Sequence, residues 1–147
     1  MYGLNAVALV FFGCINVAAY QLCKCPEGRR RTVVRWLCAV LLSGNLLRYG
    51  IIYPFVKGVV MLPVEFSTVA YFLVPAILLT SKRRLRSWAS YSGLMAGFFY
   101  YLAMIAAGGV IYGAYAPLGI YISMFCHGSI YFCGFVTIGT ELCLSLI

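Results

Sequence analysis

The sequence predicts an all-α membrane protein, a five-helix transmembrane bundle with its N-terminus outside and its C-terminus in the cytoplasm. Of the 147 residues, 64% are hydrophobic and only 10% are charged, and the mean hydropathy is +0.97. Soluble domains hold about 45–50% apolar and about 25% charged residues, so the composition excludes a water-soluble globular domain. It also excludes a disordered chain, which needs low hydrophobicity and high charge.

Five apolar stretches reach the length of about 20 residues that a membrane-spanning helix needs. The first is interpreted as a retained span and not as a signal peptide, because its basic residues follow it. Pro54 is expected to end the second helix. Pro63 lies in the first turn of the third, where proline costs little, and Pro75 in its interior predicts a kink. As a single transmembrane domain, 1–147, the chain is expected to form helices over residues 4–22, 32–53, 59–80, 88–107 and 118–140.

The last stretch stays apolar from Leu118 to Ile147, which is longer than a bilayer requires. One alternative is a long helix. The other is a turn at Gly139, Thr140 and Glu141, after which a further element begins. The second alternative predicts that the chain is a piece of a larger protein.

The basic residues gather in two loops, and they set the expected orientation. There are 11 Lys and Arg against 3 Asp and Glu, and nearly all the basic residues lie in 23–31, at Arg35 or in 81–87. The positive-inside rule places such loops in the cytoplasm, which predicts a multi-pass protein of the plasma membrane. These loops also suit anionic lipid head groups, so the excess charge does not call for nucleic acid.

No motif for a cofactor or a metal is present. Seven cysteines occur, but most lie inside apolar runs, and Cys23 and Cys25 alone are too few ligands for a metal site. The chain also lacks the phosphate-binding, zinc-protease, hydrolase and dinucleotide motifs. We therefore expect no metal and no cofactor, and any enzyme activity would have to take place inside the bilayer.

Arg48 and Glu65 are the first candidates for a site inside the membrane, where a central charge costs about 2.5–3.5 kcal/mol. Each lies about six residues inside the outer end of its expected helix, at a depth of roughly 9 Å. The two helices are joined by a short loop, so an Arg48–Glu65 ion pair is expected, with Asn45 on the same helical face as Arg48. The pair would either bind a substrate or simply fix the two helices together.

His127, the only histidine, is the second candidate. It lies about nine residues into the last helix, near the midplane. Ser123, Tyr131 and Gly134 share its helical face. A proton relay, a substrate contact or a general base would use such a residue, and the alternative is a neutral imidazole bonded to a neighbouring group.

Small and polar residues mark helix contacts. Gly93 and Gly97 form a G-x-x-x-G spacing that favours close packing, either within the chain or against a second copy or another subunit. Asn5 and Asn16 lie on one face of the first helix and are expected to hold it to its neighbours through hydrogen bonds.

Three short motifs stand out: Leu-Pro-Val-Glu-Phe-Ser-Thr at 62–68, the basic loop at 82–86 and Phe-Cys-His-Gly at 125–128. Together they resemble the YwaF-like integral membrane family, the bacterial relatives of animal phospholipid acyl-transfer membrane proteins. The resemblance implies a larger protein with further helices, and a catalytic site at His127, Glu65 and Ser67. Glu65 stands where the family usually has His. Ser67 stands where it usually has Cys, and the loss of that cysteine argues against acyl transfer through a thioester.

Three functions are compatible with the sequence. The first is binding or translocation of a small or lipidic anionic substrate in an outer-half pocket, which Arg48, Asn45, Glu65, His127 and Tyr131 would line. The second is intramembrane lipid acyl transfer, with His127 as base and Ser67 or Cys126 as nucleophile. The third is a non-catalytic membrane subunit that assembles through Gly93 and Gly97.

Overall fold

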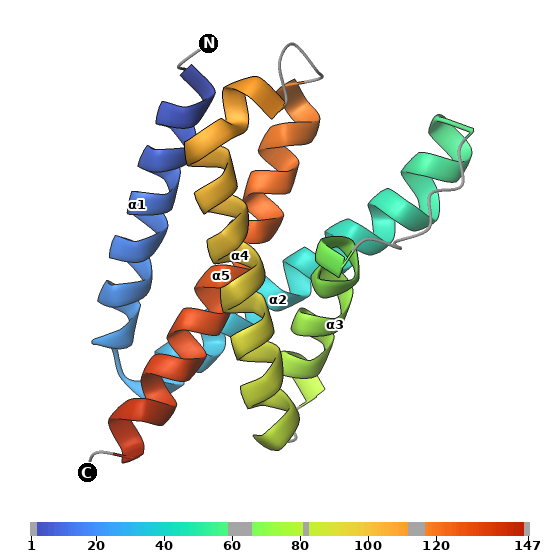
Figure 1. The fold of residues 1–147 in the computed structure, drawn as a ribbon. Coiled ribbons are helices and arrows are strands. Elements are labelled where there is room, and N and C mark those ends of the chain that lie inside the picture. Colours follow the sequence, from blue (N-terminus) through green and yellow to red (C-terminus); the bar gives the residue numbers. More distant parts are fainter. Residues whose placement is uncertain (1–2, 59–65, 81–82, 112–116, 146–147) are drawn as a thin grey trace.

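The computed structural model describes residues 3–58, 66–80, 83–111 and 117–145. All of the secondary structure in these ranges is helical, which confirms the all-α prediction (Figure 1). The elements are α1 (Gly3–Cys23), α2 (Glu27–Leu47), the π-helical segment η1 (Arg48–Val56), α3 (Phe66–Thr80), α4 (Arg83–Ile111) and α5 (Pro117–Ser145).

Within these described ranges, four helices are long and apolar enough to cross a bilayer: α1, the continuous helix formed by α2 and η1, α4 and α5. In α3 the apolar helix Thr68–Thr80 is shorter, and residues 59–65 before it lie outside the described ranges. Many large apolar side chains point outward, including Val10 (65% exposed) and Phe55 (82% exposed). An apolar surface of this extent is typical of a protein surrounded by lipid, and it agrees with a polytopic membrane protein.

The expectation that Pro54 ends the second helix is wrong. The helix continues through Pro54 to Val56. The amide of Lys57 donates to the carbonyl oxygen of Ile52, five residues earlier, at 3.2 Å. A π-helical turn has this wider hydrogen-bond spacing. The helix therefore continues past the proline as a wider π-helix and does not end there.

The last helix settles the alternatives for 139–141 in favour of a long helix. α5 runs without interruption from Pro117 to Ser145, so no turn separates its two ends. The start of α1 and the end of α5 lie at opposite ends of the bundle (Figure 1). The α1–α2 connection and the start of α4 share one end, which we call the basic end because it carries both basic stretches. That this end faces the cytoplasm stays a prediction.

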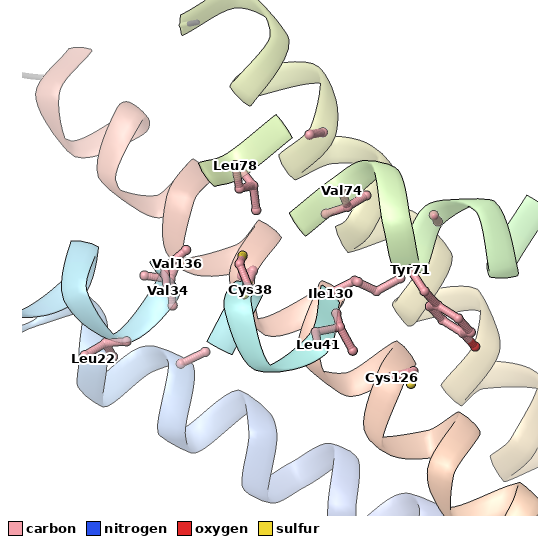
Figure 2. Packing of buried hydrophobic residues seen from close by; sticks show 14 residues of the cluster. Leu22, Val34, Cys38, Leu41, Tyr71, Val74, Leu78, Cys126, Ile130 and Val136 are labelled. Atoms are coloured by element: carbon pink, nitrogen blue, oxygen red, sulfur yellow. Dashed lines mark hydrogen bonds between the residues drawn. The ribbon is translucent and has the colours of Figure 1, made fainter. Parts of the chain in front are cut away.

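α5 is the central helix, since it packs against α1, α2, α3 and α4. The main core cluster joins these helices, and Figure 2 shows it extending from Leu22 near the basic end to Tyr71. Cys38 of α2 and Cys133 of α5 meet inside it, with their sulfur atoms 3.7 Å apart.

The closest helix contact is that of α4 with α5, and glycines make it. A Cβ placed on Gly93 would lie 2.7 Å from the carbonyl oxygen of Ile130, and one on Gly97 would lie 2.6 Å from that of His127. On the other side, a Cβ on Gly134 would lie 2.9 Å from the amide of Leu94. The G-x-x-x-G face of α4 is therefore occupied by α5 of the same chain. Assembly of a second subunit through Gly93 and Gly97 stays a prediction that this packing does not favour.

Polar side chains join α1 to its neighbouring helices, which confirms the prediction of interhelical hydrogen bonds at its two asparagines. Asn5 donates to the carbonyl oxygen of Ile105 in α4 at 2.9 Å. The hydroxyl of Tyr131 in α5 donates to Oδ1 of Asn16 at 2.7 Å. Because each partner is buried or half-buried, these bonds satisfy polar groups that lipid could not.

Candidate polar site around His127

His127 lies at the centre of a cluster of polar and aromatic side chains from three helices. The residue is 4% exposed. Its Nδ1 lies 2.6 Å from the hydroxyl of Tyr71 in α3. The ring of Tyr100 in α4 stacks on the imidazole with a centroid separation of 3.6 Å and an interplanar angle of 7°. We call Tyr71, Tyr100, Ser123 and His127 the His127 cluster.

Ser123 completes this cluster from the preceding turn of α5. Its carbonyl oxygen lies 3.0 Å from Nδ1 of His127, and its hydroxyl oxygen lies 3.4 Å from the same atom. Depending on the tautomer, Nδ1 either accepts a hydrogen bond from the hydroxyl of Tyr71 or donates one to the carbonyl oxygen of Ser123. The imidazole has hydrogen-bond partners in either tautomer, and these bonds reduce the free-energy cost of burying a polar ring in the membrane.

The tight α4–α5 contact is what brings Tyr100 to His127. Gly97 lies against the backbone of His127, and Tyr100 follows Gly97 by three residues, which places it on the same face one turn later. A larger residue at 97 would hold the two helices apart. The stacked pair therefore depends on the glycine, which is a link that spacing along one helix does not reveal.

Asn45 brings α2 to the same turn of α5. It is 2% exposed, and its Nδ2 donates to the carbonyl oxygen of Leu41 at 2.9 Å. The same nitrogen lies 3.8 Å from the sulfur of Cys126, the residue next to His127. Figure 2 shows Cys126 pointing into the packed interior on the side away from Leu22. α2, α3 and α4 therefore converge on residues 123–127 of α5.

Arg48 lies one turn beyond Asn45, where α2 passes into η1. Its Nε donates to the hydroxyl of Tyr53 at 2.7 Å, and its guanidinium lies 5.5 Å from the ring centre of Tyr49. Tyr49 in turn packs edge-on against Phe72 of α3, with ring centres 5.6 Å apart.

These contacts form one continuous set that we call the polar layer: the His127 cluster together with Asn45, Arg48, Tyr49, Tyr53 and Cys126. It joins α2, η1, α3, α4 and α5. The guanidinium of Arg48 donates its Nε–H to Tyr53, and its other N–H groups are suited to hydrogen bonds with carboxylate or phosphate oxygens. The layer therefore combines a cationic guanidinium with a buried imidazole and several hydroxyls.

The sequence-predicted site residues are distributed as follows. Arg48, Asn45 and His127 belong to the polar layer. Tyr131 shares the face of His127 but contacts Asn16 and the ring of Phe12 on α1, so it belongs to a neighbouring contact. Glu65 and the side chain of Ser67 lie outside the described residues, and so does the expected Arg48–Glu65 ion pair.

Tyr71 and Tyr100 are site residues that sequence reasoning did not select. The signal for Tyr71 is a single hydroxyl in the middle of an apolar stretch, and for Tyr100 it is its spacing from Gly97. No group of three His, Cys, Asp or Glu side chains that could hold a metal ion occurs in the described part of the chain.

Comparison of the chain with protein-family models, with curated proteins and with solved structures finds no match in any of the three. The resemblance to the YwaF-like family therefore stays a prediction from its short motifs.

Proposed function

We propose that this protein binds a small or lipidic substrate with an anionic group in the outer half of the plasma membrane, and that Arg48 is the partner of the anion. The observation that carries the proposal is the polar layer. In it, the half-buried Arg48 lies one turn beyond Asn45, and Asn45 contacts Cys126, the residue next to the buried imidazole of His127. Intramembrane ionisable groups that face the interior of a bundle mark substrate or ion pathways.

The backbone around Arg48 supports a transporter-like role. Arg48 is the first residue of η1, and Pro54 lies inside this segment. π-helical turns frequently occur at functional sites, and interrupted helices form the substrate sites of many transporters. Translocation would follow if η1 changes its pitch when the anion binds.

Removing the guanidinium tests this proposal. Arg48→Leu should abolish stabilisation of the purified protein by glycerol 3-phosphate and by dihexanoyl phosphatidate, with glycerol as the neutral comparison. In the wild type, saturation at 100 times Kd should add about 2.7 kcal/mol to the free energy of unfolding. The two phosphate compounds separate a small substrate from a lipidic one.

Two further variants keep the test decisive. Arg48→Lys retains the charge without the planar fork, and it should weaken the stabilisation without removing it. Arg35→Leu removes an exposed arginine at the basic end and should leave the stabilisation unchanged. Full stabilisation of Arg48→Leu, or an equal loss in Arg35→Leu, would refute a role for Arg48 as the anion partner.

Intramembrane acyl transfer is a second candidate, and the contact of Ser123 with His127 favours it. His127 would take the hydroxyl proton while the serine oxygen attacks an ester carbonyl, and it would return that proton to the departing alkoxide, which leaves as an alcohol. The acyl-serine would then pass its acyl group to the hydroxyl of an acceptor lipid, whose proton restores the serine. The predicted nucleophile Cys126 contacts Asn45, and Ser67 keeps this role only as a prediction. A fluorophosphonate probe should label the wild type and Ser67→Ala but not Ser123→Ala. Absence of labelling in the wild type contradicts the candidate.

A further inference from the structure

A groove separate from the polar layer lies between α1 and α2, which diverge from the connection that joins them (Figure 1). Its volume is about 620 Å³, within the range of ligand sites in proteins. Cys14 and Ala18 line one side and Val33 and Val40 the other, and Phe125 and Phe132 of α5 form the floor.

The groove is shaped for a hydrocarbon chain that lies along the helix axes. On α2 it extends from Thr32 to Val40, a rise of about 12 Å. Thr32 lies near the basic end, and Val40 lies towards the middle of the helix. Nearly all of the lining side chains are apolar. A lipid chain entering at the basic end therefore finds apolar contacts from the interface to the bilayer interior.

Basic side chains at the entrance of the groove favour an anionic lipid head group over an uncharged or zwitterionic one. Arg29 precedes the lining residue Val33 by four positions, so it continues the groove face of α2 beyond the apolar part. It is exposed. Arg31 lies on the other side of α2, where it forms an ion pair with Glu27. Lys24, over the ring of Tyr20 at 4.2 Å, adds a second cation at the end of α1.

We propose that this groove is a binding site for one anionic phospholipid, with an acyl chain between α1 and α2 and the phosphate at Arg29. The apolar lining fits the acyl chain, and the basic entrance fits the phosphate. The groove runs from this entrance towards the bilayer interior, as a lipid molecule does. The site lies on the α1–α2 side of α5, so it does not depend on the substrate proposed for Arg48. Its lipid would fill the wedge between α1 and α2 and hold them at a fixed separation.

Trp36 lines the groove and serves as the reporter. In Trp88→Phe, which leaves Trp36 as the single tryptophan, the fluorescence should be quenched by phosphatidylglycerol with brominated chains in vesicles of unlabelled phosphatidylcholine. Brominated phosphatidylcholine should need about a fivefold higher mole fraction for the same quenching, which is the effect of one basic side chain on an anionic lipid.

Matched substitutions in this background separate a bound lipid from general attraction to the surface. Arg29→Gln should abolish the preference for phosphatidylglycerol, and Arg31→Gln, with the same change of charge, should keep it. Ala18→Phe fills the groove without a change of charge and should also abolish the preference. An equal loss in Arg29→Gln and Arg31→Gln, or a full preference in Ala18→Phe, would overturn the proposal.

Discussion

Replacing Gly97 with alanine is expected to lower the free energy of unfolding by about 1–3 kcal/mol, the usual cost of overpacking a well-packed interior. A Cβ at this position would lie 2.6 Å from the carbonyl oxygen of His127 and would also meet the Cβ of Tyr131. The first atom is part of the backbone of α5 and the second is bonded directly to it, so neither can move away by a side-chain rotation. α4 would have to move outward, and the stack of Tyr100 on His127 would open. Unfolding with increasing sodium dodecyl sulfate in mixed micelles measures the change.

Gly44→Ala is the matched control. Gly44 also lies inside a long helix, but a Cβ there meets nothing within 4 Å. Alanine is favoured over glycine in a helix interior by about 1 kcal/mol, so this variant should be as stable as the wild type or more stable. A destabilisation of Gly44→Ala equal to that of Gly97→Ala would show that the loss comes from the helix backbone and not from the α4–α5 contact.

Composition and local spacing were sufficient to predict the membrane class and several helix contacts. The excess of apolar residues implied a bundle in lipid. The G-x-x-x-G at Gly93 and Gly97 indicated a close contact, and the asparagines of α1 indicated interhelical hydrogen bonds. Each of these signals acts within one helix or over a few residues, so no knowledge of the neighbouring helix is needed to recognise it.

The partners of the polar residues could not be predicted in the same way. In a soluble helix an apolar stripe shows which side faces the core, but a membrane helix is apolar towards lipid and towards its neighbours alike. The rotation of α3 that turns Tyr71 towards His127 therefore leaves no periodic trace. For the same reason the sequence shows that Tyr131 shares the face of His127 but not that its hydroxyl bonds to Asn16 of α1.

Pro54 failed as a helix end for a different reason. Its missing N–H normally interrupts an α-helix. A π-helical turn changes which carbonyl each amide meets, and nothing in the residues around Pro54 signals that change. The result matters for the site, because η1 holds Arg48 and its partner Tyr53 within one segment.

His127→Ala is the second substitution with a large expected effect. It leaves a cavity beside Tyr100, removes the stacked ring pair and deprives the buried Tyr71 hydroxyl of its partner at 2.6 Å. The cavity and the lost hydrogen bond together should cost about 2–4 kcal/mol. Tyr91→Phe removes a hydroxyl from a half-exposed ring on α4 and should change the stability little.

Coupling between Tyr71 and His127 tests the central claim most directly, namely that polar side chains of different helices turn inward and meet at one turn of α5. The measurement is the free energy of unfolding of Tyr71→Phe, His127→Ala and the double variant. Tyr71→Phe should cost about 1 kcal/mol in the wild type, near the upper range for hydrogen bonds between membrane helices. It should cost much less when His127 is absent, because the hydroxyl then keeps only its longer contact with the Ser123 hydroxyl at 3.4 Å. Additive losses in the double variant would show that the two side chains do not interact, and the polar layer would then not exist as described.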